Sequence, residues 1–294
     1  MLNGNKECKV VLIVIYNHRY DKNIDIVEKL YSMKFTDIFH LMPFYDGERK
    51  NVIPVYENSH YFQGYIAQGL KNYFDEKYDH YFFIGDDLVL NPIINSSNYK
   101  GIFNLDIEKS YIQRIASLNF YLAYWFHNKN AVDYQLKLSG LEITNMLPSA
   151  EEALSRMEEL GIEQNYLRAE QIFKIVTDEH AGKKYKTIYP MARSYSDIVI
   201  VSKYTIKKFC QYCGIFAASH LFVEVALPTS LFLASKNIVC DKELTMKGLP
   251  LWGGDNIEKY FKKYEKNLNK LLDDFPEDKL YLHPVKLSKW SINI

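Results

Sequence analysis

Two adjacent carboxylates, Asp86 and Asp87, stand at the end of an apolar run that covers residues 81–84. Such a run, with Gly85 as its exit, predicts a strand that is buried on both faces. Two acidic side chains at that point are unfavourable unless they face water or hold a cation. Hard divalent ions such as Mg²⁺ and Mn²⁺ take carboxylate oxygens together with the oxygens of a substrate diphosphate. The pair therefore indicates a metal site, and the alternative is a solvated turn, where Asp is a common residue.

The elements that must position this pair follow from the first hundred residues. Apolar, β-branched runs predict strands over residues 9–16, 35–42 and 52–56, and the spacing of apolar residues predicts helices over 24–33 and 61–73. The order β-α-β-β-α-β implies a mostly parallel sheet with crossover helices. The polar loops at 17–21, 43–47 and 86–87 would then lie at one edge of the sheet, which is where such folds bind ligands.

The composition fits a globular α/β protein. The chain has 294 residues, of which 48% are hydrophobic, enough for one large domain with a substantial core. Its 36 basic and 36 acidic residues balance, which argues against a general nucleic-acid or membrane-surface partner. We find no signal peptide and no apolar run of membrane-spanning length. We therefore expect a cytoplasmic protein, or one held peripherally at the inner face of the membrane.

Cys210 and Cys213 have the CxxC spacing, but no second pair and no nearby His completes a zinc site. We expect two buried thiols on a helix. Gly64 and Gly69 are poor helix formers within the second predicted helix, which indicates close packing or the approach of a ligand.

The rest of the chain is less regular. Residues 110–128 fit either a strand or a helix, and Ser149 predicts the start of a helix that Gly161 ends. Further helices are expected over residues 163–174, 204–214, 220–234 and 257–275, and strands over 187–191 and 196–202. Residues 244–256 are rich in Gly and Pro, which predicts a loop.

Two carboxylates in this later part are candidate catalytic residues. Glu224 interrupts an apolar stretch, and a carboxylate with apolar surroundings has the raised proton affinity that a general base needs. Asp197 begins a predicted strand and would bind acceptor hydroxyls or act as a base. For both, the alternative is a buried carboxylate with its hydrogen bonds satisfied. Trp252 and Asp255 flank two glycines and have the materials of a sugar-binding lid, or of an ordinary loop.

The order of these parts resembles a glycosyltransferase of the GT-A fold. Enzymes of this family have a Rossmann-like sheet with an Asp-x-Asp motif after a central strand, and metal-dependent members use it to bind Mn²⁺ or Mg²⁺ and the diphosphate of a nucleotide sugar. The segment 83–92 matches that motif with one departure, because Gly85 takes the place of the first Asp. The resemblance implies that Asp86 and Asp87 contact the metal, and that Asp86 also contacts the donor.

The C-terminal tail adds to the resemblance. Several retaining members of the family end with a His, which ligates the metal, and a Lys-Pro-Trp segment, whose Lys contacts the diphosphate. This chain has His283, Lys286 and Lys289-Trp290, with Leu and Ser where the family has Gly and Pro. The resemblance assigns His283 to the metal and Lys286 to the donor. The alternative for His283 is a surface residue before a proline.

The remaining donor contacts are implied by position. In this family, residues after the first strand recognise the base and ribose, which points to Tyr16 and Asn17, and Asp46 follows the second strand. Tyr16 would stack on a base and Asn17 would bond the edge of that base, and the alternative for both is ordinary loop chemistry. Arg19 and Arg49 are candidate phosphate contacts through their planar guanidinium groups.

Together these observations predict a single α/β domain with a Rossmann-like, mostly parallel sheet flanked by helices, of the GT-A type, and a mixed acceptor-side region. Residues 1–100 would bind the nucleotide sugar, 101–256 would form the acceptor side, and 257–294 would form a helix and the metal and diphosphate tail. The expected enzyme is a metal-dependent glycosyltransferase that uses Mn²⁺ or Mg²⁺. It would move a sugar from a nucleoside diphosphate sugar, with UDP favoured, to a glycan or other hydroxyl acceptor, as in surface polysaccharide synthesis.

Two rival functions stay open at this stage. One is a nucleotidyltransferase, although the loop after the first strand lacks the Gly-rich, basic character that such enzymes need. The other is a non-catalytic nucleotide- or sugar-binding protein, which the missing first Asp supports. The stereochemistry is also open, since the His-Lys tail favours retention and Glu224 as a base favours inversion.

Overall fold

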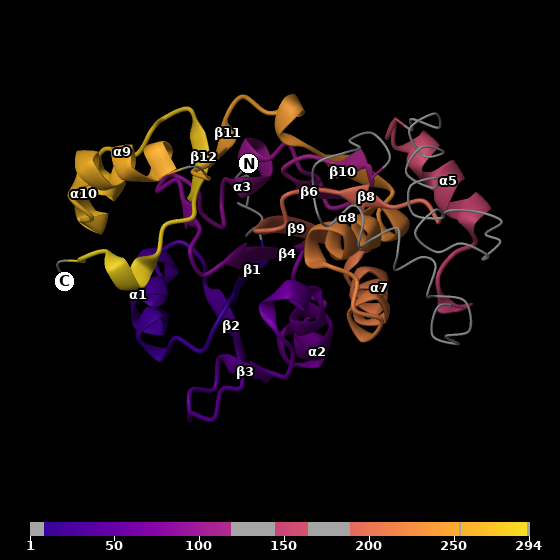
Figure 1. Cartoon of the computed structure of the whole chain (residues 1–294), viewed down its shortest axis with the longest axis horizontal. Coiled ribbons are helices and arrows are strands. Elements are labelled where there is room, and N and C mark those ends of the chain that lie inside the picture. Colours follow the sequence, from indigo (N-terminus) through magenta and orange to yellow (C-terminus); the bar gives the residue numbers. More distant parts are fainter. Residues whose placement is uncertain (1–8, 119–144, 164–188, 253, 293–294) are drawn as a thin grey trace, which may run out of the picture.

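A computed structural model of the chain describes residues 9–118, 145–163, 189–252 and 254–292 (Figure 1). Its centre is a 7-stranded sheet in the order β10-β6-β9-β4-β1-β2-β3. The strands of this sheet are β1 (Val10–Ile15), β2 (Asp37–Pro43), β3 (Val52–Val55), β4 (His80–Gly85), β6 (Lys109–Ile112), β9 (Ile198–Ser202) and β10 (Asn237–Val239). Neighbouring strands are parallel except at β9, which runs antiparallel to both β4 and β6. The predicted α/β class and mostly parallel sheet are confirmed.

The central strands are buried on both faces, as their continuous apolar runs predict. Along β1, Leu12 and Val14 belong to the core on one face, while Val11, Ile13 and Ile15 belong to the core on the other. This alternation follows from the two-residue period of a strand. Helices must therefore cover both faces of the sheet.

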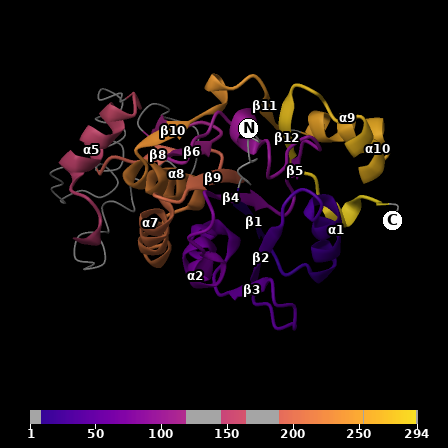
Figure 2. The same ribbon diagram turned by 180° about the vertical axis from the view of Figure 1, so that it is seen from behind.

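The helices divide between the two faces (Figures 1 and 2). Helix α1 (Asp21–Tyr31) packs on the face that carries Leu12, together with α3 (Tyr99–Ile102) and the C-terminal helices α9 (Gly254–Tyr264) and α10 (Leu268–Asp273). Helices α2 (Gln63–Tyr73), α7 (Ile206–Ala218) and α8 (Val223–Ala234) cover the other face. Helix α5 (Ala150–Glu159) packs outside α8.

Close packing explains the two glycines of α2. A Cβ at Gly64 would lie 2.9 Å from the Cβ of Ala217 on α7, and one at Gly69 would lie 2.6 Å from a methyl group of Leu41 on β2. Both distances are too short for real side chains, so α2 approaches its neighbours at a separation that only glycine allows.

The order of the first four strands creates a ligand edge. The chain passes from β1 to β2 and β3 on one side, and then returns to place β4 on the other side of β1. The carboxyl ends of β1 and β4 thus lie at a topological switch point, where open α/β sheets bind ligands. The polar loops meet there as predicted, since Arg19 after β1 forms an ion pair of 2.6 Å with Asp46 after β2.

A second, smaller sheet brings the C-terminal tail to the same edge. It has the order β11-β12-β5 and consists of β5 (Val89–Leu90), β11 (Lys247–Pro250) and β12 (Lys279–His283). Strand β12 pairs antiparallel with β5, with Tyr281 opposite Leu90 and Leu282 opposite Val89. Because β5 directly follows the Asp86-Asp87 pair, this register delivers the end of β12 to that pair.

Some sequence expectations are confirmed and others are wrong in detail. Helix α5 begins at a capping box of Ser149 and Glu152 and ends before Gly161, as predicted. The segment expected as strand or helix over 110–128 contains most of β6 and the short β7 (Ala116–Ser117). Strand β7 pairs with β8 (Ala192–Arg193), so the strand expected over 187–191 begins later. Residues 119–128, residues 187–188 and residues 164–174 of the helix expected over 163–174 lie outside the described part.

Two further corrections concern the C-terminal third. The single helix expected over residues 257–275 is two helices, because Glu265 and Lys266 have left-handed backbone (φ 52° and 53°) between α9 and α10. The expected loop at 244–256 contains β11 and the start of α9. Strand β11 forms by pairing with β12, a partner that the residues of 244–256 alone do not indicate. Short 3₁₀ turns complete the described chain: η1 (Ser59–Tyr61), η4 (Asp241–Glu243) and η5 (Leu287–Lys289).

Among the described residues, no helix is both long enough and apolar enough to cross a membrane.

Candidate functional site

The centre of the site is a contact between Asp87 and His283. Asp87 lies in the turn between β4 and β5, and His283 is the last residue of β12. The imidazole Nε2 lies 3.0 Å from Oδ1 of Asp87. The His283 side chain is 3% exposed and that of Asp87 is 16% exposed, so the pair sits just below the surface.

A second carboxylate lies on the other side of the same imidazole. Nδ1 of His283 is 3.4 Å from Oδ2 of Asp197, a distance for an ion pair but without hydrogen-bond geometry. Asp197 precedes β9, whose antiparallel direction places its amino end beside the carboxyl end of β4. Burial lowers the pKa of His283, but Asp197 and Asp87 outweigh it, so the pKa lies above the ordinary value. The histidine is therefore held between two acids.

Asp86 has a different environment from its neighbour. It is buried, and its Oδ2 accepts a hydrogen bond of 3.1 Å from the amide of Asn23 on α1, while its Oδ1 faces the backbone N–H of Asn17 at 3.5 Å. Burial, followed by the charge of Asp87, raises the pKa of Asp86 to about 7. Both oxygens are thus directed at the protein, and Asp86 ties the loop after β1 to the loop after β4.

The structure gives a reason for glycine at position 85. A Cβ there would lie 3.3 Å from Oδ1 of Asp87, the atom that faces His283, and 4.0 Å from the carbonyl oxygen of Asp197. The backbone N–H of Gly85 also donates to that carbonyl at 2.9 Å. A side chain at this position would crowd the Asp87 carboxylate. Glycine in place of the first Asp of the motif therefore leaves the space in which Asp87, His283 and Asp197 approach one another.

The tail is fastened to the site by its backbone. The N–H of Val285 donates to the carbonyl of Asp87 at 2.5 Å, and the N–H of Leu251, after β11, donates to the carbonyl of His283 at 2.6 Å. Lys286 follows directly and is exposed. The tail therefore holds the backbone of Lys286 one residue beyond the contact of Val285 with Asp87.

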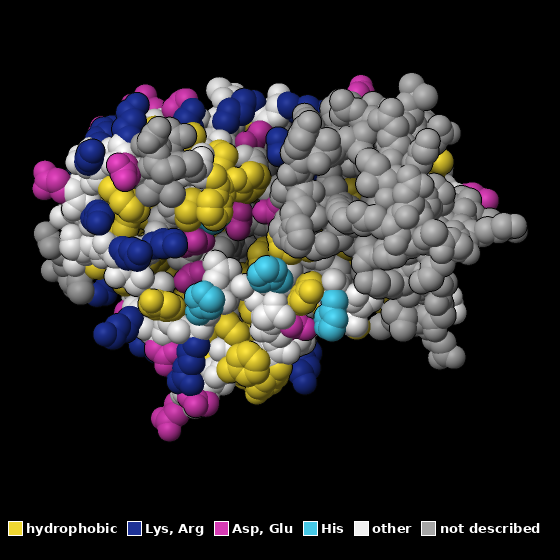
Figure 3. All heavy atoms as spheres, in the orientation of Figure 1, with side chains coloured by type: hydrophobic (Ala, Val, Ile, Leu, Met, Phe, Trp, Pro, Cys, Tyr) yellow, Lys and Arg dark blue, Asp and Glu magenta, His cyan; other side chains and the backbone are white. Residues whose placement is uncertain are grey.

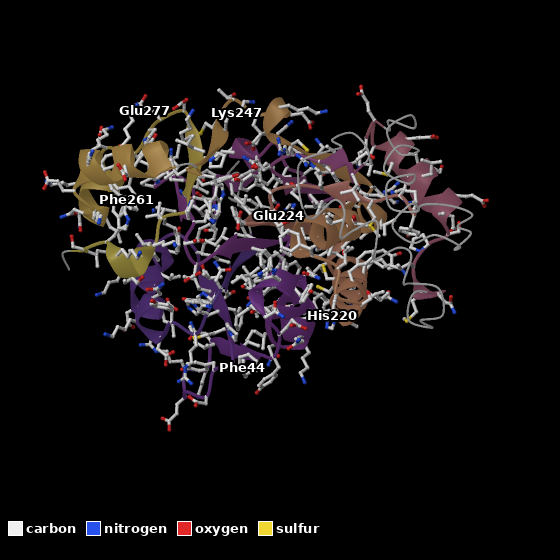
Figure 4. All side chains as sticks on the ribbon, in the orientation of Figure 1. Phe44, His220, Glu224, Lys247, Phe261 and Glu277 are labelled. Carbon is white, nitrogen blue, oxygen red and sulfur yellow. The ribbon has the colours of Figure 1, made fainter. Side chains whose placement is uncertain are left out.

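Glu224 lies near the centre of the face shown in Figure 4, on the first turn of α8. Burial, followed by the charge of Asp197, raises the pKa of its carboxyl to about 7, and the nearby Arg193 and Arg114 oppose that rise. Its backbone carbonyl accepts a hydrogen bond of 3.0 Å from the N–H of Ser194. Figure 3 shows acidic side chains in the hollowed centre of this face, between an apolar area and atoms that are not described.

The donor residues expected after β1 and β2 have mixed outcomes. Tyr16 is fully buried and its hydroxyl lies 2.9 Å from Nδ1 of His40, so it presents no ring face for stacking on a base, and that expectation is wrong. Asn17 is exposed at the edge. Arg19 and Asp46 bind each other, and the Arg19 guanidinium also contacts Asp21 at 3.1 Å. Arg49 is paired with Asp25 at 2.7 Å, farther out.

The expected lid residues are only partly described. Trp252 is 56% exposed, and its ring lies edge-on to the imidazole of His283 at a centroid distance of 5.5 Å. It therefore covers one side of the histidine. The side chain of Asp255 lies outside the described residues.

The donor set fits a divalent ion in part. Two ligands at right angles, each about 2.1 Å from an octahedral ion, are about 3.0 Å apart, which is the separation of the Asp87 and His283 atoms. Asp197 lies beside Nδ1 of His283, the ring nitrogen away from Asp87. A carboxylate in that position commonly orients a metal-bound histidine. Asp86 does not fit, because its oxygens face Asn23 and Asn17. Among the described side chains, no group of three or more His, Cys, Asp and Glu is arranged as a metal site.

Two residues that act on the carboxylates of the candidate site were not predicted from the sequence. Asn23 is buried and binds Asp86, and the signal was its position four residues before Val27 on the apolar side of α1. Arg114 follows β6, and its charge opposes the rise in the pKa of Glu224 that burial causes. The proximity of residues 114 and 224 is a long-range contact that no local pattern reveals.

A hollow of about 290 Å³ lined by Asp37 and Asn51 lies at the amino end of β2, the opposite edge of the sheet.

The CxxC segment has no role at this site. Cys210 and Cys213 are buried, unpaired thiols on α7, as expected, and burial raises the pKa of the Cys210 thiol to about 12.

Comparison with protein-family models gives no match for this chain, and comparison with curated proteins gives none either.

Proposed function

We propose that the protein is a glycosyltransferase that moves a sugar from a nucleoside diphosphate sugar to a hydroxyl acceptor, assisted by Mn²⁺ or Mg²⁺. One observation carries this proposal: His283, from the end of the chain, lies 3.0 Å from Asp87 at the carboxyl edge of β4. A tail that returns to a strand end and adds an imidazole to a carboxylate supplies the ligand types that such ions accept.

The surroundings support a diphosphate as the ligand. The pair lies at the switch point between β1 and β4, where α/β sheets bind nucleotides. Lys286 is exposed beside it and would neutralise phosphate oxygens. A bound Mn²⁺ or Mg²⁺ would supply the positive charge that stabilises a departing diphosphate. Asp87 and His283 would hold the ion, and Asp197 would fix the orientation of His283.

Glu224 is the proposed general base. In the transfer, the acceptor oxygen forms a bond to C1 of the donor sugar, the bond from C1 to the diphosphate oxygen breaks, and the nucleoside diphosphate leaves with that electron pair. Glu224 takes the proton of the acceptor hydroxyl. A pKa of about 7 makes its carboxylate both available and basic near neutral pH.

The test is a binding titration of the purified chain with UDP and with GDP, each with and without Mn²⁺. We expect one nucleotide to bind tightly in the presence of the ion, and Asp87→Ala and His283→Ala to remove that binding. Asp278→Ala is the matched control, because Asp278 is exposed at the other end of β12 and pairs only with Lys279 among the described residues.

The outcomes separate the candidate functions. Nucleotide binding that needs Asp87 and the ion supports the proposal, and hydrolysis or transfer of the bound nucleotide sugar establishes turnover. Nucleotide binding without turnover would instead identify a binding protein, which the unavailable oxygens of Asp86 favour. Absence of nucleotide binding under every condition would exclude the transferase.

A further inference from the structure

Four aromatic or imidazole rings form a connected group on the surface. The rings of Tyr61 and His220 are stacked, with centroids 5.1 Å apart and an angle of 28° between their planes. His60 lies against Tyr61 on one side at 6.5 Å and against Phe222 on the other at 5.9 Å. We call these four residues the ring platform.

The ring platform presents both flat faces and polar edges. His60 and His220 are exposed, while Tyr61 and Phe222 are half-buried. In the described structure, no hydrogen bond engages the hydroxyl of Tyr61 or the imidazole nitrogens of His60 and His220. The platform therefore offers unused donors and acceptors beside its ring faces.

His220 has left-handed backbone at the end of a helix. His220 has φ 60° and follows the end of α7, where its N–H donates to Ala217 and the next N–H, of Leu221, donates to Phe216. This is the pattern of a helix end at which glycine is the favoured residue, because a Cβ is unfavourable in the left-handed region. Strained backbone that places an exposed side chain points to a functional role for that side chain.

The scaffold under the platform is rigid. The buried amide of Gln63, at the start of α2, donates to the carbonyl of Leu221 at 2.8 Å and so joins the two segments that carry the rings. Asn58 caps η1 by accepting from the N–H of His60 at 3.0 Å. The backbone segments that carry the rings are thus held together without a ligand, which lowers the entropy cost of binding.

The platform lies beside the candidate catalytic residue. Phe222 immediately precedes α8, and Glu224 is on the first turn of that helix. Glu224 and His220 are on the same face of the molecule in Figure 4. Figure 3 shows exposed histidine side chains on this face.

We propose that the ring platform binds sugar units of the acceptor, so that the acceptor is an oligosaccharide or longer glycan and not a single sugar. The faces of sugar rings carry C–H groups that stack on aromatic and imidazole faces, while their hydroxyls need donors and acceptors at the edges. The ring platform provides both, and its Phe222 comes two residues before Glu224, where the reacting hydroxyl would sit. This inference rests on the proposed transferase function.

The experiment measures binding of the full chain to a printed array of neutral and acidic oligosaccharides and the corresponding monosaccharides. We expect wild-type protein to bind at least one class of oligosaccharide, with monosaccharides about tenfold weaker or more. His220→Gly and Tyr61→Ala should each lower that binding about tenfold. His220→Gly is the sharpest variant, because glycine relieves the backbone strain and leaves the fold at least as stable.

Two controls are built into the chain. Tyr204→Ala removes a tyrosine that is 65% exposed at the opposite edge of the sheet, and it should leave glycan binding unchanged. In NMR spectra, the imidazole signals of His60 and His220 should shift when the array-selected oligosaccharide is added, while those of His80, buried at the amino end of β4, should not.

The results decide the inference separately from the proposed function. If wild-type protein binds UDP or GDP but no oligosaccharide, or if His220→Gly binds glycan as wild type does, the ring platform is not an acceptor site and the inference fails alone. If glycan binding depends on the rings but no nucleotide binds, the ring platform stands as a glycan site and the transferase proposal fails. Ring-dependent binding to phosphatidylglycerol vesicles in place of glycan would overturn the inference.

Discussion

His283 and Asp87 are separated by 196 positions in the chain, yet their side chains meet at 3.0 Å. The contact depends on the antiparallel register of β12 with β5, and it is fastened by the hydrogen bond from the N–H of Val285 to the carbonyl of Asp87. The end of the chain is therefore part of the site. The fold holds a carboxylate and an imidazole together at the ligand edge of the sheet, and the predictions below test what that arrangement requires.

Gly85→Ala should weaken ion-dependent nucleotide binding by about tenfold, or about 1.4 kcal/mol. The reason is that the new Cβ would lie 3.3 Å from Oδ1 of Asp87 and displace the carboxylate from His283. The measurement is the nucleotide titration with Mn²⁺ together with a thermal melt. Gly101→Ala is the control, because a Cβ at Gly101 meets nothing within 4 Å. Equal nucleotide affinity in wild type and Gly85→Ala would show that the position of Asp87 does not matter.

Asp197→Asn should lower the affinity for Mn²⁺ by about 10- to 100-fold, as loss of a carboxylate behind a metal-bound histidine does. The amide keeps the size of the side chain but removes the charge that lies 3.4 Å from Nδ1 of His283. Free Mn²⁺ can be measured by electron paramagnetic resonance. The matched variant Asp278→Asn should bind the ion as wild type does. If Asp197→Asn keeps full Mn²⁺ affinity but loses transfer activity, Asp197 acts on the acceptor and not through His283.

Glu224→Gln should lower the rate of sugar transfer by at least about 100-fold while nucleotide binding stays unchanged. In wild type the rate should rise with pH, be half-maximal near pH 7 and level off above it, because the carboxyl must lose its proton to act as a base and its pKa is about 7. The measurement is a pH profile of transfer with saturating donor. A Glu224→Gln enzyme that retains the rate and the profile would remove this residue from the chemistry.

The sequence predicts the first half of the fold well, because its strands are buried on both faces and their apolar runs need no partner to be recognised. The run that ends at Gly85 is β4, and the loops after β1, β2 and β4 meet as expected. Resemblance in the motif order also pointed to Asp87 and His283, which the structure brings together.

Apart from the local break between α9 and α10, the failures depend on contacts between residues far apart in the chain. Tyr16 was expected to face a ligand, but its hydroxyl finds His40 on β2 and the ring is buried. Nothing near residue 247 predicts β11, since its partner β12 begins at Lys279. The ring platform joins η1 to the end of α7, and neither segment alone shows that the rings would stack. Contacts of this kind depend on packing that local residue patterns do not encode.

His80 should make the fold sensitive to mild acid. Its Nε2 donates to the carbonyl of Lys109 at 3.0 Å and its Nδ1 accepts from the hydroxyl of Tyr99 at 2.8 Å, so the buried ring is neutral. Burial lowers its pKa to about 4. Because the unfolded chain binds the proton near pH 6.5 and the folded chain does not, stability is unaffected above that pH and falls as the pH drops towards 4. Between pH 7 and pH 5 the contribution of His80 to stability should fall by about 2 kcal/mol, which is read as the difference between wild type and His80→Gln. Urea unfolding at the two pH values measures it. Between pH 7 and pH 5, the free energy of unfolding of His80→Gln should fall less than that of wild type. His60→Gln, at an exposed histidine, should behave as wild type does. If His80→Gln shows the same change as wild type, other groups cause the acid sensitivity.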